Sequence, residues 1–398
     1  MSFILKRLFL LLPIILFYSC STDNSTPEPI STPVAGDLIS YEVKNEYAAE
    51  DLKFLASIGG FDRAVPLIKN DITTYKVTYL TSDKYGQLIE ASGIVSFPET
   101  APTKDWILLS RGTIIASNEA PSVTNLPSYE IGASLGYAII VPDLIGFGDS
   151  EEIFQYYFIK DKSTETSINL TLAAKTLANK LEIDTSDNYF LAGYSQGGFS
   201  SLSIAEKLLE SEIEQINVLG CFTGAGGYNL PLVMNEILKN EQYESPAFLA
   251  LIVLSYYEYY DFDFELSDIF KSPYHNTIQE LLSGKLNTPQ VNNQLPKTLN
   301  TLFTNTFLTD LKNEENSNPI YQKLQTNSVS IFETHFPIYF YHSPFDEIIP
   351  YSSSENISDN FLKSNSNIFF EEIEGTSHSN AALYMLIKSL EQISMINN

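Results

Sequence analysis

The sequence is poor in cysteine, in histidine and in positive charge, and each shortage narrows what the chain can do. It has 2 cysteines and 4 histidines among 398 residues, and 23 Lys and Arg stand against 49 Asp and Glu, which gives a formal net charge of −26. A chain this acidic repels phosphate backbones and anionic lipid surfaces, so we expect no nucleic-acid partner. The histidines form no His-x-x-x-His pair and no cluster with cysteine, so we expect no metal and no cofactor.

The N-terminus carries a short apolar run, Leu8–Tyr18, which follows two basic residues and ends just before Cys20. The run is too short to span a bilayer, and it is typical of a processed leader. It resembles a bacterial lipoprotein signal. Residues 1–19 are therefore predicted to be the signal peptide, and Cys20 is predicted to be the lipid-attachment site.

Residues 20–36 are rich in Ser, Thr and Pro, and we interpret them as a disordered tether. The predicted location is the bacterial cell envelope, with membrane contact only through Cys20. The bulky Phe17 and Tyr18 depart from the usual cleavage box, so ordinary secretion is the alternative. If Cys20 is lipidated, Cys221 can form no disulfide, and we interpret it as a small buried apolar residue.

The rest of the chain alternates between short apolar runs and helical patterns. Residues 41–67 have a partly helical pattern, and a hairpin with strands at 72–82 and 88–97 follows. Continuous apolar runs then predict strands buried on both faces. These runs lie at residues 106–109, 138–141, 189–192, 218–222, 338–341 and 368–373. The pattern predicts an α/β fold with a mostly parallel central sheet.

One long interruption follows the sixth predicted strand. Residues 228–336 are too many for a loop, and they contain helix-like pieces. We therefore expect a helical cap inserted there, with residues 37–227 and 337–398 together forming the α/β core.

The most informative stretch is Gly193–Gly198, which reads Gly-Tyr-Ser-Gln-Gly-Gly between a strand-like run and a helical pattern. In that setting Gly-x-Ser-x-Gly predicts that Ser195 is a nucleophile held on a sharp turn. Gly193 and Gly197 remove Cβ atoms that would collide with neighbouring elements. The N–H of Gln196 is then free to donate to a developing oxyanion. The alternative is an ordinary serine in a glycine-rich turn.

A serine nucleophile needs a base, and His378 is the candidate because it follows the last strand-like run, where catalytic groups collect in α/β sheets. His275 lies within the predicted cap and His335 lies just before a strand. His342 is interpreted as a residue that packs near the acid without chemistry. The alternative is that His378 is an ordinary histidine in a surface loop.

The acid that orients the base is predicted to be Asp346, directly after the run 338–341. Glu347 is the rival, since a one-residue shift would exchange them. The chain order Ser195, Asp346, His378 is that of α/β-hydrolases.

A second oxyanion donor is expected from the loop 110–115, where Thr113 is the candidate through its backbone N–H and its hydroxyl. The glycine-rich turn 142–150 is interpreted as support beneath the site. Phe147 in that turn is the one residue that could instead line the substrate.

Over residues 70–395 the chain resembles the α/β-hydrolase superfamily, and within it the secretory lipase family related to fungal lipase A. The resemblance is carried by the Gly193–Gly198 motif, the acid turn Phe345–Pro350, the loop Gly375–His378 and the predicted cap. One departure is Arg111-Gly112, where relatives commonly carry His-Gly. The resemblance implies helices on both faces of the sheet.

It also implies a monomeric serine carboxylic-ester hydrolase, a lipase or esterase, that acts on small-molecule or lipid esters through an acyl-enzyme. The stretch Phe248–Tyr257 would then line an acyl groove or form the core of the cap itself.

Two other functions remain open from the sequence. One is a serine peptidase of the same fold, such as an aminopeptidase, with Asp261, Asp263 and Glu265 as candidate groups for a substrate ammonium. The other is a non-catalytic envelope lipoprotein that binds glycan or lipid, which the complete set of Ser195, Asp346 and His378 disfavours.

Overall fold

The computed structural model describes residues 32–59, 62–99, 102–125, 129–211, 213, 215–312, 318–364, 367–373 and 376–396. The chain divides into two units, Met1–Pro33 and Val34–Asn398, and the fold below is that of the second. The predicted signal peptide, Cys20 and most of the predicted tether lie outside the described residues. Within the described ranges, every helix is too short or too polar to span a lipid bilayer.

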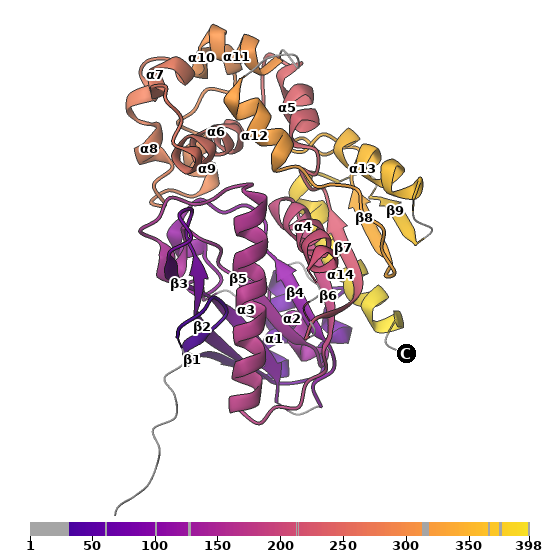
Figure 1. Cartoon of the computed structure of the whole chain (residues 1–398). Coiled ribbons are helices and arrows are strands. Elements are labelled where there is room, and N and C mark those ends of the chain that lie inside the picture. The colour runs from indigo at the N-terminus through magenta and orange to yellow at the C-terminus, as the bar shows by residue number, and fades with distance from the viewer. Residues whose placement is uncertain are drawn as a thin grey trace, which may run out of the picture. The chain divides into compact units, whose positions relative to one another are not determined.

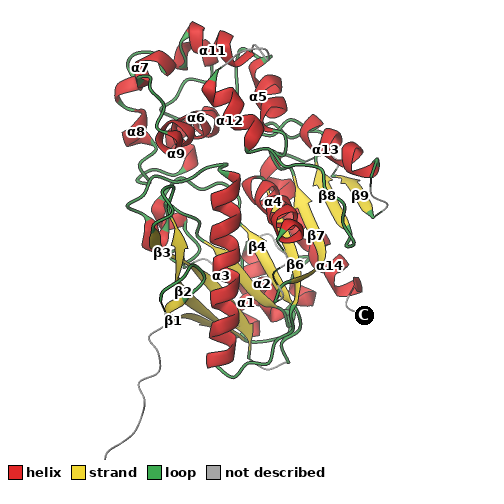
Figure 2. Cartoon of the chain, in the orientation of Figure 1, coloured by secondary structure: helices red, strands yellow, loops and turns green. Residues whose placement is uncertain are grey.

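The described strands form one nine-stranded sheet in the order β1-β2-β3-β5-β4-β6-β7-β8-β9 (Figures 1 and 2). The pairs β1–β2, β2–β3 and β3–β5 are antiparallel. The pairs β5–β4, β4–β6, β6–β7, β7–β8 and β8–β9 are parallel. The strands are β1 Leu38–Tyr47, β2 Ile72–Ser82, β3 Leu88–Pro98, β4 Trp106–Ser110, β5 Ala138–Pro142, β6 Asn188–Tyr194, β7 Asn217–Gly224, β8 Ile338–His342 and β9 Ile368–Glu372. The predicted mostly parallel α/β sheet is confirmed.

The start of the sheet differs from the sequence prediction. Residues 41–47, expected to belong to a partly helical segment, lie in the edge strand β1, and the helix α1 Ala49–Ile58 follows. β1 lacks a continuous apolar run, and its apolar Ile39, Tyr41 and Val43 are exposed. The strand counted as sixth from the sequence is therefore β7, the seventh.

Helices cover both faces of the sheet (Figure 1). Alternate residues of the central strands point to opposite faces: Leu108, Ile140 and Leu191 pack with α3 and α4, while their neighbours in the strands pack with α1, α2 and α14. Besides α1, the helices on the two faces are α2 Ile131–Ser134, α3 Lys160–Lys180, α4 Gln196–Glu210, α13 Ser352–Leu362 and α14 His378–Ile396. Because both faces are covered, the strands read as continuous apolar runs. Cys221 lies fully buried in β7, as expected.

Between β7 and β8 the chain forms a group of helices, residues 230–326, that we call the helical insert (Figure 2). Its helices are α5 Leu230–Leu238, α6 Pro246–Tyr260, α7 Leu266–Ile269, α8 Ile278–Leu281, α9 Thr288–Asn292, α10 Leu299–Leu302, α11 Asn305–Lys312 and α12 Pro319–Thr326. The insert is tied to the rest of the chain by side chains. The Tyr256 hydroxyl donates to the Phe158 carbonyl at 3.0 Å, and the Tyr243 hydroxyl donates to the Ile348 carbonyl at 3.0 Å.

Candidate active site

Ser195 lies between the end of β6 and the start of α4, on a strained turn. Its φ of 60° and ψ of −122° are rare for a residue with a side chain, and such a conformation costs about 1–3 kcal/mol. The Ser195 amide donates to the Gly224 carbonyl of β7 at 2.9 Å, which ties the turn to the sheet. This strand–turn–helix geometry is the one that presents a nucleophilic serine.

Two glycines make the turn possible. A Cβ at Gly193 would collide with the carbonyl oxygen of Gly197, and a Cβ at Gly197 would collide with the carbonyl oxygen of Ser110 in β4. Both obstacles are backbone atoms of packed elements, which cannot swing aside as a flexible side chain could. The reason inferred from the sequence for these two glycines is therefore confirmed.

Asp346 and His378 are joined directly. The Asp346 Oδ2 lies 2.6 Å from His378 Nδ1, and its Oδ1 accepts the backbone N–H groups of Ile348 and Ile349 at 2.8 Å each. The Asp346 side chain is fully buried, and that of His378 is 10% exposed. The turn that follows Asp346 thus holds one carboxylate oxygen, and the other oxygen points to the imidazole of His378.

A second imidazole also reaches this carboxylate. His342, at the end of β8, is fully buried and places its Nε2 3.1 Å from Asp346 Oδ2. Burial by itself disfavours the charged carboxylate, but the hydrogen bonds from His342 and His378 outweigh it and hold the pKa of Asp346 well below its usual range. The sequence indicated that His342 packs near the acid, but not that it contacts the carboxylate directly.

His378 is the first residue of α14, whereas the sequence predicted that it lies in the loop before this helix. Its backbone N–H donates to Glu347 Oε2 at 3.1 Å, so the rival acid contacts the main chain of the histidine while Asp346 contacts its ring. The ring of Tyr194 lies 5.0 Å from the His378 ring, centroid to centroid. The imidazole therefore lies beside the residue that precedes Ser195.

The predicted oxyanion residues lie on two elements. Gln196 is the first residue of α4, so its N–H has no acceptor within the helix. The Thr113 Oγ1 lies 2.7 Å from the hydroxyl of Tyr157, a residue that no sequence signal singled out.

Arg111, the departure from the His-Gly pattern, braces this region from within. Its guanidinium donates to the Gly112 carbonyl at 3.0 Å and to Gln196 Oε1 at 3.3 Å. It also donates to the Asp143 carbonyl at 3.0 and 2.7 Å, and lies 4.5 Å from the centre of the Phe147 ring. Burial lowers the pKa of Arg111 to about 10, so the group is charged at neutral pH. Phe147 thus supports the arginine.

An apolar cavity opens beside Ser195. It is lined by Tyr157, Phe158, Ser195, Gly227, Leu230, Val233, Met234, Ile237, Tyr243, Phe248, Leu249, Ile252, Leu324 and Ile349. Half of these residues come from α5 and α6 of the helical insert. The space amounts to about 20 Å³, little more than one water needs. Of the apolar stretch Phe248–Tyr257, Phe248, Leu249 and Ile252 line the cavity, while Leu251 and Leu254 are buried outside it.

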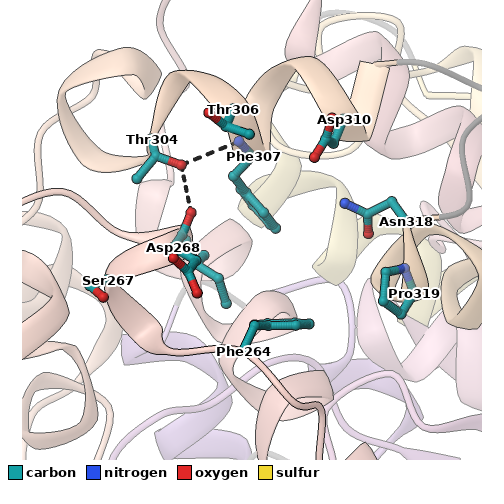
Figure 3. A pocket seen from close by; sticks show the side chains of 10 residues that line it. Phe264, Ser267, Asp268, Thr304, Thr306, Phe307, Asp310, Asn318 and Pro319 are labelled. Carbon is teal, nitrogen blue, oxygen red and sulfur yellow. Dashed lines mark hydrogen bonds between the residues drawn. The ribbon is translucent and has the colours of Figure 1, made fainter.

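A larger pocket of about 580 Å³ lies within the helical insert (Figure 3). Figure 3 shows Phe264 and Phe307 with Asp268 and Asp310 around it, but its lining has no histidine and no cysteine. His275 lies in the insert and His335 lies before β8. Across the described residues, no group of three or more His, Cys, Asp or Glu could hold a metal ion.

Comparison with known protein structures agrees with the fold described above. The chain has 25% identity to a presumed hydrolase of Legionella pneumophila, with a TM-score of 0.84 over 91% of this chain and 98% of that one. The rice cell wall degrading esterase LipA of Xanthomonas oryzae aligns with a TM-score of 0.78 at 17% identity, over 92% and 98%. Candida antarctica lipase A in its closed state aligns with a TM-score of 0.66 at 18% identity, over 93% and 84%. No curated protein sequence matches the chain.

A protein-family profile also matches the amino-acid sequence of the chain. The profile of the family described as Secretory lipase matches residues 124–391, about two thirds of the chain. That match spans the Ser195 turn, the acid turn and the start of α14. The family is one of secreted or envelope enzymes that act on ester substrates. The chain belongs to the secretory lipase family, and it is a carboxylic ester hydrolase with the α/β-hydrolase fold.

Proposed function

We propose that the chain hydrolyses carboxylic esters through a triad of Ser195, His378 and Asp346 and a covalent acyl-enzyme. The observation that carries this proposal is the 2.6 Å hydrogen bond between the buried Asp346 carboxylate and His378 Nδ1. Asp346 fixes the tautomer in which Nδ1 bears the proton, so Nε2 is left as the base. The strained turn at Ser195 supports the choice of nucleophile.

In the first step, Nε2 of His378 takes the Ser195 hydroxyl proton while Oγ attacks the ester carbonyl carbon. The oxyanion that forms accepts hydrogen bonds from the N–H groups of Gln196 and Thr113. As the carbonyl re-forms, the bond to the alcohol oxygen breaks, and the imidazolium returns the proton to that oxygen. Water then repeats the sequence on the acyl-enzyme, and the acid and Ser195 are released.

We propose that the apolar cavity takes the acyl chain. Its lining is aliphatic and aromatic, and it includes Ser195 itself, so an alkyl chain attached to the reacting carbonyl would be shielded from water there. Since the cavity is nearly closed, side chains must move to admit a chain. Met234, which is unbranched and flexible, suits such movement.

Leu249→Ala should shift the preference of the enzyme toward longer acyl chains. The deletion enlarges the cavity, and each extra methylene that it buries contributes about 0.8 kcal/mol, or roughly fourfold in rate. We expect the ratio of kcat/KM for p-nitrophenyl octanoate to that for the butyrate to rise by about four- to tenfold. This ratio does not depend on the folded fraction.

Leu254→Ala is the matched control, because Leu254 is buried in the same helix but does not line the cavity. Its octanoate-to-butyrate ratio should equal that of the wild type. Equal ratios in all three proteins would show that the acyl chain binds elsewhere.

A fluorophosphonate probe tests the nucleophile directly. Ser195 Oγ should displace fluoride from phosphorus, and mass spectrometry should then find the probe on the peptide that carries Ser195. Ester hydrolysis should be lost in step with labelling, since the phosphonylated serine cannot attack a substrate. Labelling of a different serine, with hydrolysis lost in parallel, would refute the assignment of Ser195.

The organisation of the whole chain is also a proposal. We propose a signal peptide at residues 1–19, lipid attachment at Cys20, a tether at 20–36, and a monomeric core of residues 37–227 and 337–398 with a cap at 228–336. The helical insert between the neighbouring strands β7 and β8 supports the division between core and cap. The pattern of basic residues, apolar run and cysteine supports the anchor.

A further inference from the structure

His342 has a defined hydrogen-bond partner on each side of its ring. Its Nε2 faces two oxygens, Asp346 Oδ2 at 3.1 Å and the Ile349 carbonyl at 3.2 Å. Its Nδ1 lies 2.7 Å from Ser354 Oγ in α13. Since a carboxylate and a carbonyl can only accept, Nε2 must carry a proton. In the neutral ring, Nδ1 then accepts the hydroxyl proton of Ser354.

His342 and Ser354 are both fully buried, so water does not compete for the hydrogen bond between them. The imidazole is therefore oriented by Ser354 of α13 on one side and by the acid turn on the other.

We propose that His342 is a positioning residue of the active site, which holds the Asp346 carboxylate in line with His378 and is itself held in place by Ser354 of α13. This inference rests on the proposed role of Asp346 as the acid of the triad. His342 does not line the substrate cavity, so it acts on the reaction only through Asp346.

His342 affects both the orientation and the charge balance of the Asp346 carboxylate. Two backbone N–H groups hold Oδ1 of Asp346, but without His342 the other oxygen would lose one of the two imidazole donors that hold it. The carboxylate could then rotate about its bond to Cβ and carry His378 with it. Misplacement of a reacting group by about 1 Å can cost 10²-fold in rate.

The groups around His342 are few. Asp346 and Ser354 contact its two nitrogens, and the Tyr351 ring lies 5.4 Å from its ring, centroid to centroid. Glu372 pairs with it across β8 and β9, but the Glu372 carboxylate accepts the Tyr351 hydroxyl at 2.9 Å. Asp346 is therefore the acidic group that His342 contacts directly.

Two amide substitutions separate the roles of the two ring nitrogens. His342→Gln places an amide N–H near the position of Nε2 and can keep the bond to Asp346. His342→Asn reaches only the position of Nδ1, so it can keep the bond to Ser354 but not that to Asp346. We expect His342→Gln to stay within about threefold of the wild type, and His342→Asn to lower kcat by about 10- to 100-fold. KM should be little changed in both variants.

The pH–rate profile gives a second measurement that packing alone would not change. In His342→Asn the less well compensated carboxylate attracts the imidazolium proton more strongly, so the acid limb of kcat/KM should move to higher pH. His342→Gln should leave that limb in place. Equal losses in both variants with an unmoved acid limb would overturn the inference, because they would indicate packing only.

Asp346→Asn distinguishes this inference from the proposed function on which it rests. If Asp346→Asn keeps wild-type activity, the triad itself is wrong. If Asp346→Asn is inactive while folded His342→Asn behaves as the wild type, the triad stands and the positioning role of His342 is refuted.

Discussion

Ser195→Ala is expected to lower kcat for p-nitrophenyl butyrate by about 10⁵- to 10⁶-fold, down to the residual rate that the oxyanion donors and binding alone supply. The substitution removes the oxygen that would form the acyl-enzyme, and the neighbouring glycines offer no other nucleophile. KM and the unfolding midpoint should change little, because the Ser195 hydroxyl is small and lies beside the substrate cavity. Steady-state kinetics on the purified full-length protein measure the effect.

Ser200→Ala is the matched control. Ser200 lies in α4, the helix that follows Ser195. It is 1% exposed, and its hydroxyl has no hydrogen-bond partner among the described residues. Its removal should leave kcat within roughly twofold of the wild type, as expected of a substitution that breaks no interaction. If Ser195→Ala were as active as Ser200→Ala, ester hydrolysis would have to proceed without Ser195.

Asp346→Asn is expected to lower kcat by about 10⁴-fold, the scale found when the acid of such a triad is made a neutral amide. The asparagine amide can donate where the carboxylate only accepts, so it would favour the wrong tautomer of His378. It also could not compensate the charge of the imidazolium. Kinetics at the pH optimum, with the fold checked by circular dichroism, measure the loss.

Glu347→Gln tests the choice between the two neighbouring acids. The Glu347 carboxylate accepts only the backbone N–H of His378 among the bonds described for it, and glutamine can accept the same bond. We expect a change of less than about tenfold. A greater loss in Glu347→Gln than in Asp346→Asn would exchange the two assignments.

The lowered pKa of Asp346 also links it to folding. The folded carboxylate ionises at a lower pH than the same group in the unfolded chain, whose pKa is about 3.9. Its ionisation therefore stabilises the fold above about pH 4, and this contribution is lost as the pH falls through the lowered pKa. In urea unfolding, the stability difference between the wild type and Asp346→Asn should accordingly shrink from pH 7 toward pH 3.

The sequence predicted the fold and the candidate residues because each lies at a strand end with a strong local signal. Ser195 has the glycines that its turn requires, and Asp346 directly follows a buried apolar run. The chemistry of a hydrolase then limits the base to four histidines. The hydrogen bond between Asp346 and His378 joins residues that the sequence could only pair by their order.

The sequence could not show features that depend on the path of the chain through a turn or on which side of an element faces the core. His342 lies four residues before Asp346, and only the path of the acid turn brings its Nε2 to the carboxylate. β1 was missed because its apolar residues alternate and face solvent at the sheet edge. Helix α6 is apolar all round, so periodicity could not tell that Leu249 lines the cavity while Leu254 does not.

The place of the helical insert has a consequence for how the enzyme matures. β7 and β8 pair in parallel although Cys221 and its partner Ile338 are 117 residues apart (338 − 221). Such distant pairings form slowly, because the entropy of closing the loop is lost before the contacts are gained. Ser195 lies before β7 in the chain, whereas Asp346 and His378 lie after β8. If Ser195, Asp346 and His378 act together as proposed, the chain can therefore cleave esters only after β8 has joined the sheet.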